Sequence, residues 1–437
     1  MRYNSQDELT RRQFMLENAR NYLGVSLLPM LGSSIASEAF AQSASQNKNP
    51  AKSVIFLNMS GGMSHLDTFD LKLNNKEVSG PIEGLKTPID GYSVSQYLPH
   101  TAKVMDRFTV INSMHSKIGA HEQGQYLVHK SYVPRGTIVH PSVGAWVSKL
   151  AGRSNPTLPP YIAISSSAKS TGGGWMGANY SAAMVGDPAK GLEDVTRPHS
   201  VTEEDFHRRL KLADMINQKF HNDHGSAEVK SYHKVFEEAA KVMESEDLAA
   251  FDLSKEPASV KNLYGQSKFG QGCLLARRLV EADVRFIEVG LGGWDTHYDN
   301  FTGVEQRCSE LDQPLAALIQ DLESKGLLDS TLVVLATEFG RTPQIQSQYR
   351  EGRGHHPSAF TYLVAGGGTK RGFVYGASDE RGQKAVVDPV SIYDFNSTIA
   401  YALGIDHEEV HYSPSKRPFR MAGPDKEKGA PITSIFA

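Results

Sequence analysis

The segment Arg285-Phe-Ile-Glu-Val-Gly-Leu-Gly-Gly-Trp-Asp-Thr-His297 indicates both the fold and the place of a functional site. Its first half is an apolar run of the kind that forms a buried strand, and the paired glycines end that strand. Asp295 and His297 follow directly. In open α/β sheets, ligands bind beyond the carboxyl ends of the strands. A carboxylate and an imidazole together suit a divalent metal such as zinc.

Two more apolar runs, Val54–Met59 and Thr331–Ala336, end in polar side chains. The polar residues that follow these runs are Ser60, His65, Asp67, Glu338 and Arg341. A charge at the exit of a buried strand is costly unless it is paired or bound to a cation. Glu338 is therefore expected to bind a metal or to pair with Arg341. Arg341 has the alternative of binding an anionic substrate through a bidentate contact.

Histidines mark two further segments. Gly352-Arg-Gly-His355-His356-Pro357 lies between two apolar runs, and at least one of its adjacent histidines is expected to be a ligand or a catalytic group. His121 and Glu122 stand where the loop after a predicted strand enters a helix. A helix N-terminus at that point favours an anion.

Apolar runs and helical patterns alternate along the chain, which predicts an α/β fold with a doubly wound, mostly parallel sheet. The predicted strands cover residues 53–59, 108–112, 161–164, 285–289, 331–336 and 360–365. The predicted helices cover residues 94–105, 123–129, 142–151, 269–282, 306–325 and 390–403. Residues 166–188 are expected to form a surface loop, and residues 202–253 a helical insertion packed on one face of the sheet.

The N-terminus has the pattern of a twin-arginine signal peptide. Thr10-Arg11-Arg12-Gln13-Phe14 is followed by a weakly apolar stretch and by Ala39-Phe-Ala41, which fits a cleavage site. We expect a signal peptide over residues 1–41, a linker over 42–52 and the mature domain over 53–437. The protein is then carried by the twin-arginine translocase to the periplasm or the cell exterior.

Composition excludes some classes of partner. The 437 residues carry a formal net charge of −3, so nothing indicates nucleic-acid binding. The sequence contains no run of eighteen apolar residues, so no transmembrane span is predicted. Cys273 and Cys308 both lie in predicted helices, and no disulfide is expected between them.

The motifs together resemble a bacterial family known as domain of unknown function 1501. They are Ser60-Gly-Gly-Met-Ser-His-Leu-Asp-Thr-Phe-Asp70, Gly292-Gly-Trp-Asp-Thr-His297, Glu338-Phe-Gly-Arg-Thr-Pro343 and Gly354-His-His-Pro357. That family is similar to the alkaline phosphatase and sulfatase superfamily, which implies an alkaline-phosphatase-like sheet with one or two metals at the strand exits. The metal ligands implied are His65, Asp67, Asp295, His297, Glu338, His355 and His356, with zinc, manganese or calcium as the ion. The catalytic residues implied are Ser60, His121, Glu122 and Arg341.

One departure from the superfamily concerns the nucleophile. The superfamily places a serine, threonine or modified cysteine where this chain reads Gly119-Ala120-His121-Glu122. Three alternatives follow: a metal-activated water attacks directly, His121 and Glu122 act as ligands or bases, or hydrolysis is lost. The resemblance thus implies an exported hydrolase of phosphate or sulfate esters, acting on a small anionic ester or a sulfated or phosphorylated glycan. The alternative is a non-catalytic binding or assembly protein on the same scaffold.

Overall fold

The central sheet is built from the apolar runs of the sequence. The structure is a computed structural model that describes residues 50–193, 200–224, 241–243 and 245–437. Within these ranges the main sheet has nine strands, ordered β12-β4-β11-β8-β1-β7-β5-β6, with β15 paired to β4. Its strands are β1 Ser53–Asn58, β4 Phe108–His115, β5 Tyr161–Ile164, β6 Ala183–Val185, β7 Phe286–Gly290, β8 Thr331–Ala336, β11 Phe360–Ala365, β12 Phe373–Tyr375 and β15 Val390–Ser391.

The sheet is mixed and mostly parallel, so the predicted fold class is confirmed. β1 lies at the centre and pairs in parallel with β7 on one side and β8 on the other. β11 is the exception, because it runs antiparallel to both β4 and β8. The carboxyl ends of β1, β4, β7 and β8 therefore meet at one edge, whereas β11 starts there.

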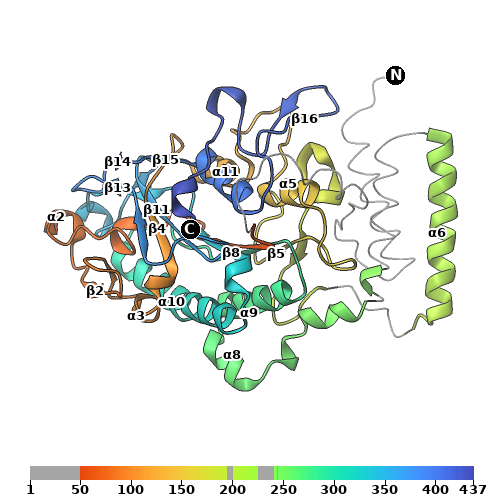
Figure 1. The fold of residues 1–437 in the computed structure, drawn as a ribbon, viewed down its shortest axis with the longest axis horizontal. Coiled ribbons are helices and arrows are strands. Elements are labelled where there is room, and N and C mark those ends of the chain that lie inside the picture. The colour runs from red at the N-terminus through yellow and green to blue at the C-terminus, as the bar shows by residue number, and fades with distance from the viewer. Residues whose placement is uncertain (1–49, 194–199, 225–240, 244) are drawn as a thin grey trace.

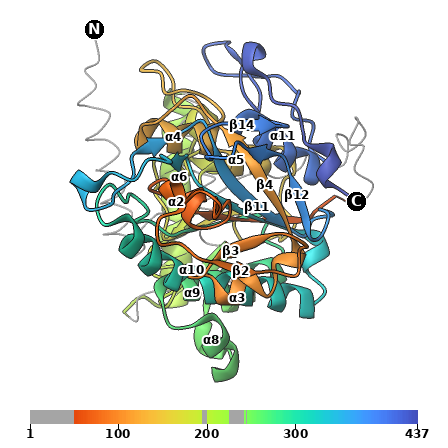
Figure 2. The same ribbon diagram turned by 90° about the vertical axis from the view of Figure 1, so that its left-hand side faces the viewer.

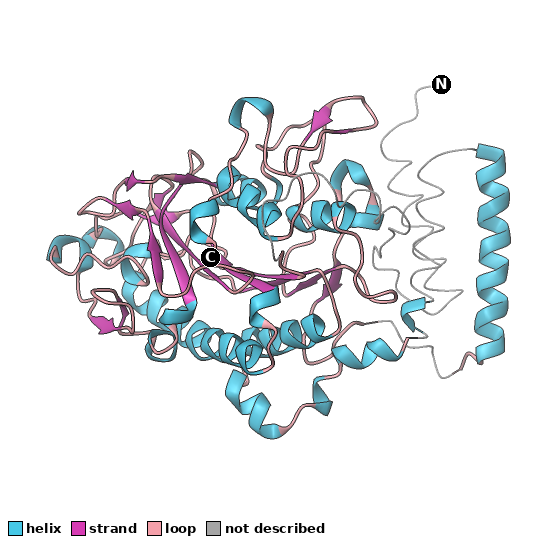
Figure 3. Cartoon of the chain, in the orientation of Figure 1, coloured by secondary structure: helices cyan, strands magenta, loops and turns pink. Residues whose placement is uncertain are grey.

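Both faces of the sheet are covered by helices (Figures 1 and 3). Strand β1 shows why: Ile55 and Leu57 join the core on one face, and Val54 and Phe56 join the core on the other. A strand buried on both faces is a continuous apolar run. The helices on the first face are α3 Pro99–Ala102, α8 Ala258–Tyr264, α9 Lys268–Glu281 and α10 Asn300–Ser324. Those on the second are α4 His121–Lys130, α5 Val143–Leu150 and α11 Ile392–Ala402.

Short elements account for the differences from the prediction. The predicted helix over residues 94–105 contains only the four-residue α3, since the preceding residues form β3 Ser93–Ser95, which pairs with β2 Gly84–Lys86 (Figure 2). The predicted loop over residues 166–188 contains the edge strand β6. A two-stranded ribbon, β9 Gly340–Arg341 with β10 His355–His356, was not predicted at all.

The remaining predictions on organisation fall partly outside the described residues. The signal peptide and nearly all of the linker lie there, as do residues 225–240 and 244 of the expected insertion. Helix α6 Glu203–His224 is described and lies at the right-hand end of Figure 1, beyond the edge of the sheet, while Val242, Phe251 and Leu253 of the expected insertion join the core of the first face. Cys273 and Cys308 are both free and buried. None of the helices in the described part of the chain has the length and apolar character to cross a membrane.

Candidate metal centre

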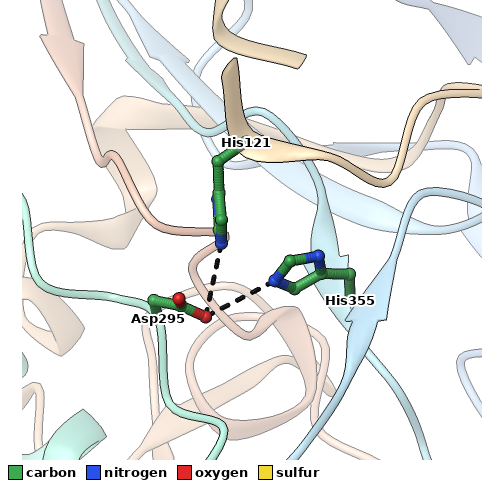
Figure 4. A group of neighbouring side chains, drawn as sticks. All are labelled: His121, Asp295 and His355. Carbon is green, nitrogen blue, oxygen red and sulfur yellow. Dashed lines mark ion pairs between the residues drawn. The ribbon is translucent and has the colours of Figure 1, made fainter. Parts of the chain in front are cut away.

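Three side chains from distant segments meet beyond the carboxyl edge of the sheet (Figure 4). His121 begins α4, Asp295 follows β7, and His355 lies in β10. Their ligand atoms all lie within 4.8 Å of one another. Nε2 of His121 lies 3.3 Å from Oδ1 of Asp295, and Nε2 of His355 lies 3.5 Å from the same oxygen.

His297 joins this cluster as a third imidazole. Its Nε2 atom lies 3.3 Å from Oδ1 of Asp295 and 2.9 Å from Nε2 of His355. The four side chains keep between 24% and 46% of their surface exposed, so the cluster opens to solvent. We use the name metal centre for the candidate site formed by His121, Asp295 and His355 together with His297.

Hydrogen bonds outside the cluster fix which ring nitrogen faces it. Nδ1 of His121 lies 2.6 Å from Oε1 of Glu338, and Nδ1 of His355 lies 2.6 Å from the carbonyl oxygen of Gly119. Both partners only accept, so each Nδ1 carries a hydrogen. Nε2 of each ring then faces Asp295, and it offers a lone pair when the ring is neutral. A histidine that donates its other N–H to a carboxylate or carbonyl is the usual arrangement of a metal ligand.

Glu338 is buried and serves as a hydrogen-bond acceptor beneath the metal centre. It accepts from His121, from Gln125 Nε2 at 2.7 Å and from the backbone N–H of Gly61 at 2.9 Å. Burial by itself raises the pKa of this carboxyl, but these donors outweigh it and lower the pKa below its usual value. In return, the hydrogen bond to Glu338 raises the pKa of His121. Glu338 therefore orients a ligand rather than lying among the ligand atoms.

Arg341 orients Asp295. Its guanidinium donates to Asp295 Oδ1 at 2.6 Å and to the backbone carbonyls of Gly61, Gly62, Trp294 and Arg353. Burial by itself raises the pKa of Asp295, but Arg341 outweighs that effect and lowers the pKa to about 2. The side chain is fully buried and bonded to these groups, and its predicted role in pairing with Glu338 or holding an anionic substrate stays a prediction.

Three residues predicted as ligands lie apart from the metal centre. Asp67 is buried against Arg353, with Oδ2 2.9 Å from Nε, and His65 is buried with Nε2 2.9 Å from the carbonyl of Gly382. Burial lowers the pKa of His65 to about 4. His356 bonds to the carbonyl of Gln383 instead of joining its neighbour. Adjacent residues of a strand point to opposite faces, so only one of the paired histidines reaches the centre.

Two residues predicted as catalytic have side chains that are at least partly exposed to solvent. Ser60 is half-buried at the end of β1, where its backbone N–H donates to Leu291 and its carbonyl accepts from Trp294. Glu122 is exposed on the first turn of α4, next to His121. Their catalytic roles stay predictions.

The sequence interpretation missed the residues that support the centre. Gln125 and the buried pair of His129 with Glu288 lie on or under α4, and Arg353 ties the β10 loop to Asp67. One signal was available, since His121, Gln125 and His129 are spaced four residues apart on one helix face. The partners of Arg353 gave no such signal, because they are distant in sequence.

The donor set fits a divalent ion such as zinc. Three imidazoles and one carboxylate are ligands that zinc accepts. His121 Nε2 is buried and lies 3.3 Å from Oδ1 of Asp295, the oxygen that Nε2 of His297 and of His355 also approach. Nitrogen and oxygen donors of this kind, directed at one place, are the donor set of a cation site.

Comparisons with known proteins give a family and distant structural similarity. A family model described as "Protein of unknown function (DUF1501)" matches residues 51–436. No curated protein was found to match the chain.

Three solved structures illustrate the structural similarity. The PsFucS1 sulfatase from Pseudoalteromonas sp. is 13% identical, with 100% of this chain and 77% of that chain covered and a TM-score of 0.42. The lipoteichoic acid synthase LtaP from Listeria monocytogenes is 12% identical, with coverage of 94% and 81% and a TM-score of 0.37. The C-terminal periplasmic domain of EcEptC from Escherichia coli, in complex with Zn, is 10% identical, with coverage of 89% and 91% and a TM-score of 0.39. At this level of similarity, chemistry has to be argued from the residues of this chain.

Proposed function

The chain belongs to the DUF1501 family, and because that family has no assigned activity we propose a function from the site: an exported, metal-dependent hydrolase of phosphate or sulfate esters. One observation carries the proposal. Nε2 atoms of His121, His297 and His355 lie at 3.3, 3.3 and 3.5 Å from one oxygen of Asp295, in a cluster open to solvent. Four ligand-type side chains approach one place, and the outer ring nitrogens of His121 and His355 are already bonded, which favours a bound cation.

The chain's own residues have separate tasks in this proposal. His121, Asp295, His297 and His355 would hold the ion. A divalent metal supplies positive charge that polarises an ester and lowers the pKa of water. Glu338 and Arg341 keep His121 and Asp295 in place. Glu122, exposed beside His121, is available to exchange a proton with solvent.

The charge of the centre favours an anionic substrate. Three neutral imidazoles and one carboxylate leave a divalent ion with net positive charge, which attracts a phosphate or sulfate ester. A small anionic ester or a sulfated or phosphorylated glycan meets this requirement. Export by the twin-arginine route to the periplasm or cell exterior remains part of the proposal, on the evidence of Arg11, Arg12 and Ala39-Phe-Ala41.

Metal content and turnover together test the proposal. The protein is purified without chelator, its bound metals are measured by mass spectrometry, and hydrolysis of p-nitrophenyl phosphate and p-nitrophenyl sulfate is followed. We expect close to one divalent ion per chain, and at least a hundredfold loss of turnover in His121→Ala and His355→Ala. His100→Ala, at an exposed histidine of α3, is the matched control. Turnover that survives both substitutions would contradict the proposal.

A non-catalytic binding protein is the second candidate. It is favoured by the absence of a hydroxyl or thiol in Gly119-Ala120-His121-Glu122 and by the burial of Arg341. A protein that binds one metal tightly and turns over neither ester would support this candidate over hydrolysis.

A further inference from the structure

Helix α4 presents a row of three polar side chains to the sheet. His121, Gln125 and His129 are spaced four residues apart, so they lie on one face of the helix. His121 and Gln125 both contact Glu338, each on a different carboxylate oxygen. His129 lies one turn further along and contacts Glu288 instead. The first two thus hold one carboxylate between them.

The orientation of the Gln125 amide is fixed by its partners. Glu338 only accepts, so Gln125 has to present its NH2 group to Oε2, at 2.7 Å. Its oxygen then faces Asn58 at the end of β1, whose Nδ2 donates to it at 3.1 Å. Asn58 therefore donates to Gln125 and Gln125 donates to Glu338, which accepts from His121 on its other oxygen.

Gln125 is the main donor to one oxygen of Glu338. The other donor to Oε2 is Thr337 Oγ1, at 3.3 Å, and that hydroxyl also lies 3.4 Å from the carbonyl of Phe339. Oε1 has two close donors of its own, His121 and Gly61. Without Gln125, Oε2 keeps only the longer contact with Thr337 among the described residues, and the orientation of the carboxylate then depends on the two donors to Oε1.

We propose that Gln125 is a positioning residue of the metal centre, which holds Glu338 so that His121 keeps its hydrogen on Nδ1 and directs Nε2 at the metal. The inference deepens the proposed function and rests on it for the presence of a metal. Gln125 acts only through Glu338, and this sets the form of the test.

Zinc affinity is the first readout. The full mature chain is freed of metal, and zinc binding is measured by competition with a chromophoric chelator. Gln125→Met keeps the length of the side chain and removes its donor. We expect a 10- to 100-fold loss of zinc affinity, the range found when partners of ligand histidines are removed. Gln123→Met is the control, since Gln123 is exposed on the same helix. Equal affinities in both variants would overturn the proposal.

A double-mutant cycle separates positioning from general damage to the fold. Glu338→Gln is combined with Gln125→Met, and the zinc affinities of the four proteins are compared. If Gln125 acts through Glu338, adding Gln125→Met to the Glu338→Gln protein should lower its zinc affinity by less than threefold. Losses that multiply would show that Gln125 acts elsewhere, and would contradict the inference. Should Gln125→Met not fold, Gln125→Asn tests the same contact, since the shorter amide keeps its donor but not its reach.

The tautomer of His121 is the second readout, and it needs no metal and no activity. Nitrogen chemical shifts of ¹⁵N-histidine-labelled protein distinguish Nδ1–H from Nε2–H, and His121→Gln identifies the signal. We expect Nδ1–H in the wild type and in Gln123→Met, and a mixture in Gln125→Met. An unchanged tautomer in Gln125→Met overturns the inference even if hydrolysis is observed. A shifted tautomer in a protein that binds no metal would instead count against the proposed function alone.

Discussion

Gly61 is the residue on which the packing of the metal centre most directly depends. Its backbone has φ of +116°, and a Cβ there would lie 2.7 Å from the backbone nitrogens of Trp294 and Asp295. Its N–H also donates to Glu338. A glycine is needed for the backbone angle and for the close approach of the loop that carries Asp295.

Replacing Gly61 should therefore damage metal binding more than stability. We expect Gly61→Ala to weaken zinc binding at least tenfold, because the Asp295 loop has to move. Gly91→Ala provides the comparison, since Gly91 has φ of +70° and no atom within 4 Å of an added Cβ. That variant should lose about 1 kcal/mol of stability from strain and keep its zinc affinity. Similar zinc affinities in the two variants would contradict this account.

The protonation of His121 predicts the pH dependence of metal binding. The hydrogen bond to Glu338 raises the pKa of His121 above 6.5, and a proton on Nε2 competes with the metal. Zinc affinity should therefore rise with pH through this raised pKa and fall on acidification. Asp295 does not set this range, because Arg341 lowers its pKa to about 2.

The same argument gives a test by substitution. Glu338→Gln removes the largest cause of the raised pKa, so the pH midpoint of zinc binding should move to lower pH. The dissociation constant is measured from pH 5.5 to 8.5 in both proteins. A midpoint that stays in place would show that another group controls the proton.

At the scale of elements, a buried ion pair joins α4 to β7. Nε2 of His129 lies 3.1 Å from Oε1 of Glu288, and both side chains are almost fully buried. Nδ1 of His129 bonds to the carbonyl of Gln125, so it carries a hydrogen. Burial lowers the pKa of His129, but Glu288 and the carbonyl outweigh it, and the net pKa is raised.

Breaking this pair should destabilise the fold. His129→Ala leaves Glu288 buried without its partner, which costs roughly 3–5 kcal/mol. His129→Met with Glu288→Met should regain most of that loss, and His100→Ala should cost little. Unfolding in urea measures all three. Because the folded pKa is raised, the wild-type contribution is present below pH 6.5 and is lost as pH rises through the folded value. The prediction would be contradicted if the free energy of unfolding of the wild type did not fall as pH rises, or if His129→Ala were as stable as the wild type.

Strands could be predicted from the sequence where both of their faces are buried. The runs 53–59, 161–164, 331–336 and 360–365 are apolar because their strands are covered on both faces. The single helix predicted over residues 94–105 is wrong, although Val94, Leu98, Ala102 and Met105 have helical spacing. These residues reach one core from separate short elements, with Val94 in β3, Ala102 in α3 and Met105 in a turn of 3-10 helix. The antiparallel direction of β11 has no local signal, since an apolar run looks the same in either direction.

At the scale of the whole molecule, the sheet explains why part of the centre could be predicted. Asp295 and Glu338 follow parallel strands, and their meeting at one edge follows from that topology. His65 and Asp67 also follow such a strand, but a turn of 3-10 helix buries them, and Arg353 takes up Asp67. Arg353, which binds Asp67 in place of a metal, comes from a distant segment, so the local sequence of residues 60–70 does not predict this pair.

Export is a property of the whole chain, and its prediction rests on the sequence alone. Arg11→Lys with Arg12→Lys should leave uncut precursor in the cytoplasm, because the twin-arginine pair is the signal for that route. Cell fractionation with an antibody to the mature domain measures the distribution. Lys48→Arg, in the predicted linker, is the control and should be exported as the wild type is. Normal processing of the double variant would contradict the signal-peptide prediction.

The candidate ligands of the metal centre are distributed over about half of the chain, from His121 to His355. No fragment that ends before residue 355 contains them all, so a chain still being synthesised gains this site only near the end of translation. A bound ion would then stabilise the fold only after the last ligand has been synthesised. The melting temperature would depend on the metal concentration: at a hundredfold excess over the dissociation constant, binding raises the free energy of unfolding by about 2.7 kcal/mol. Metal supply would thus decide how long the finished protein resists unfolding and proteolysis.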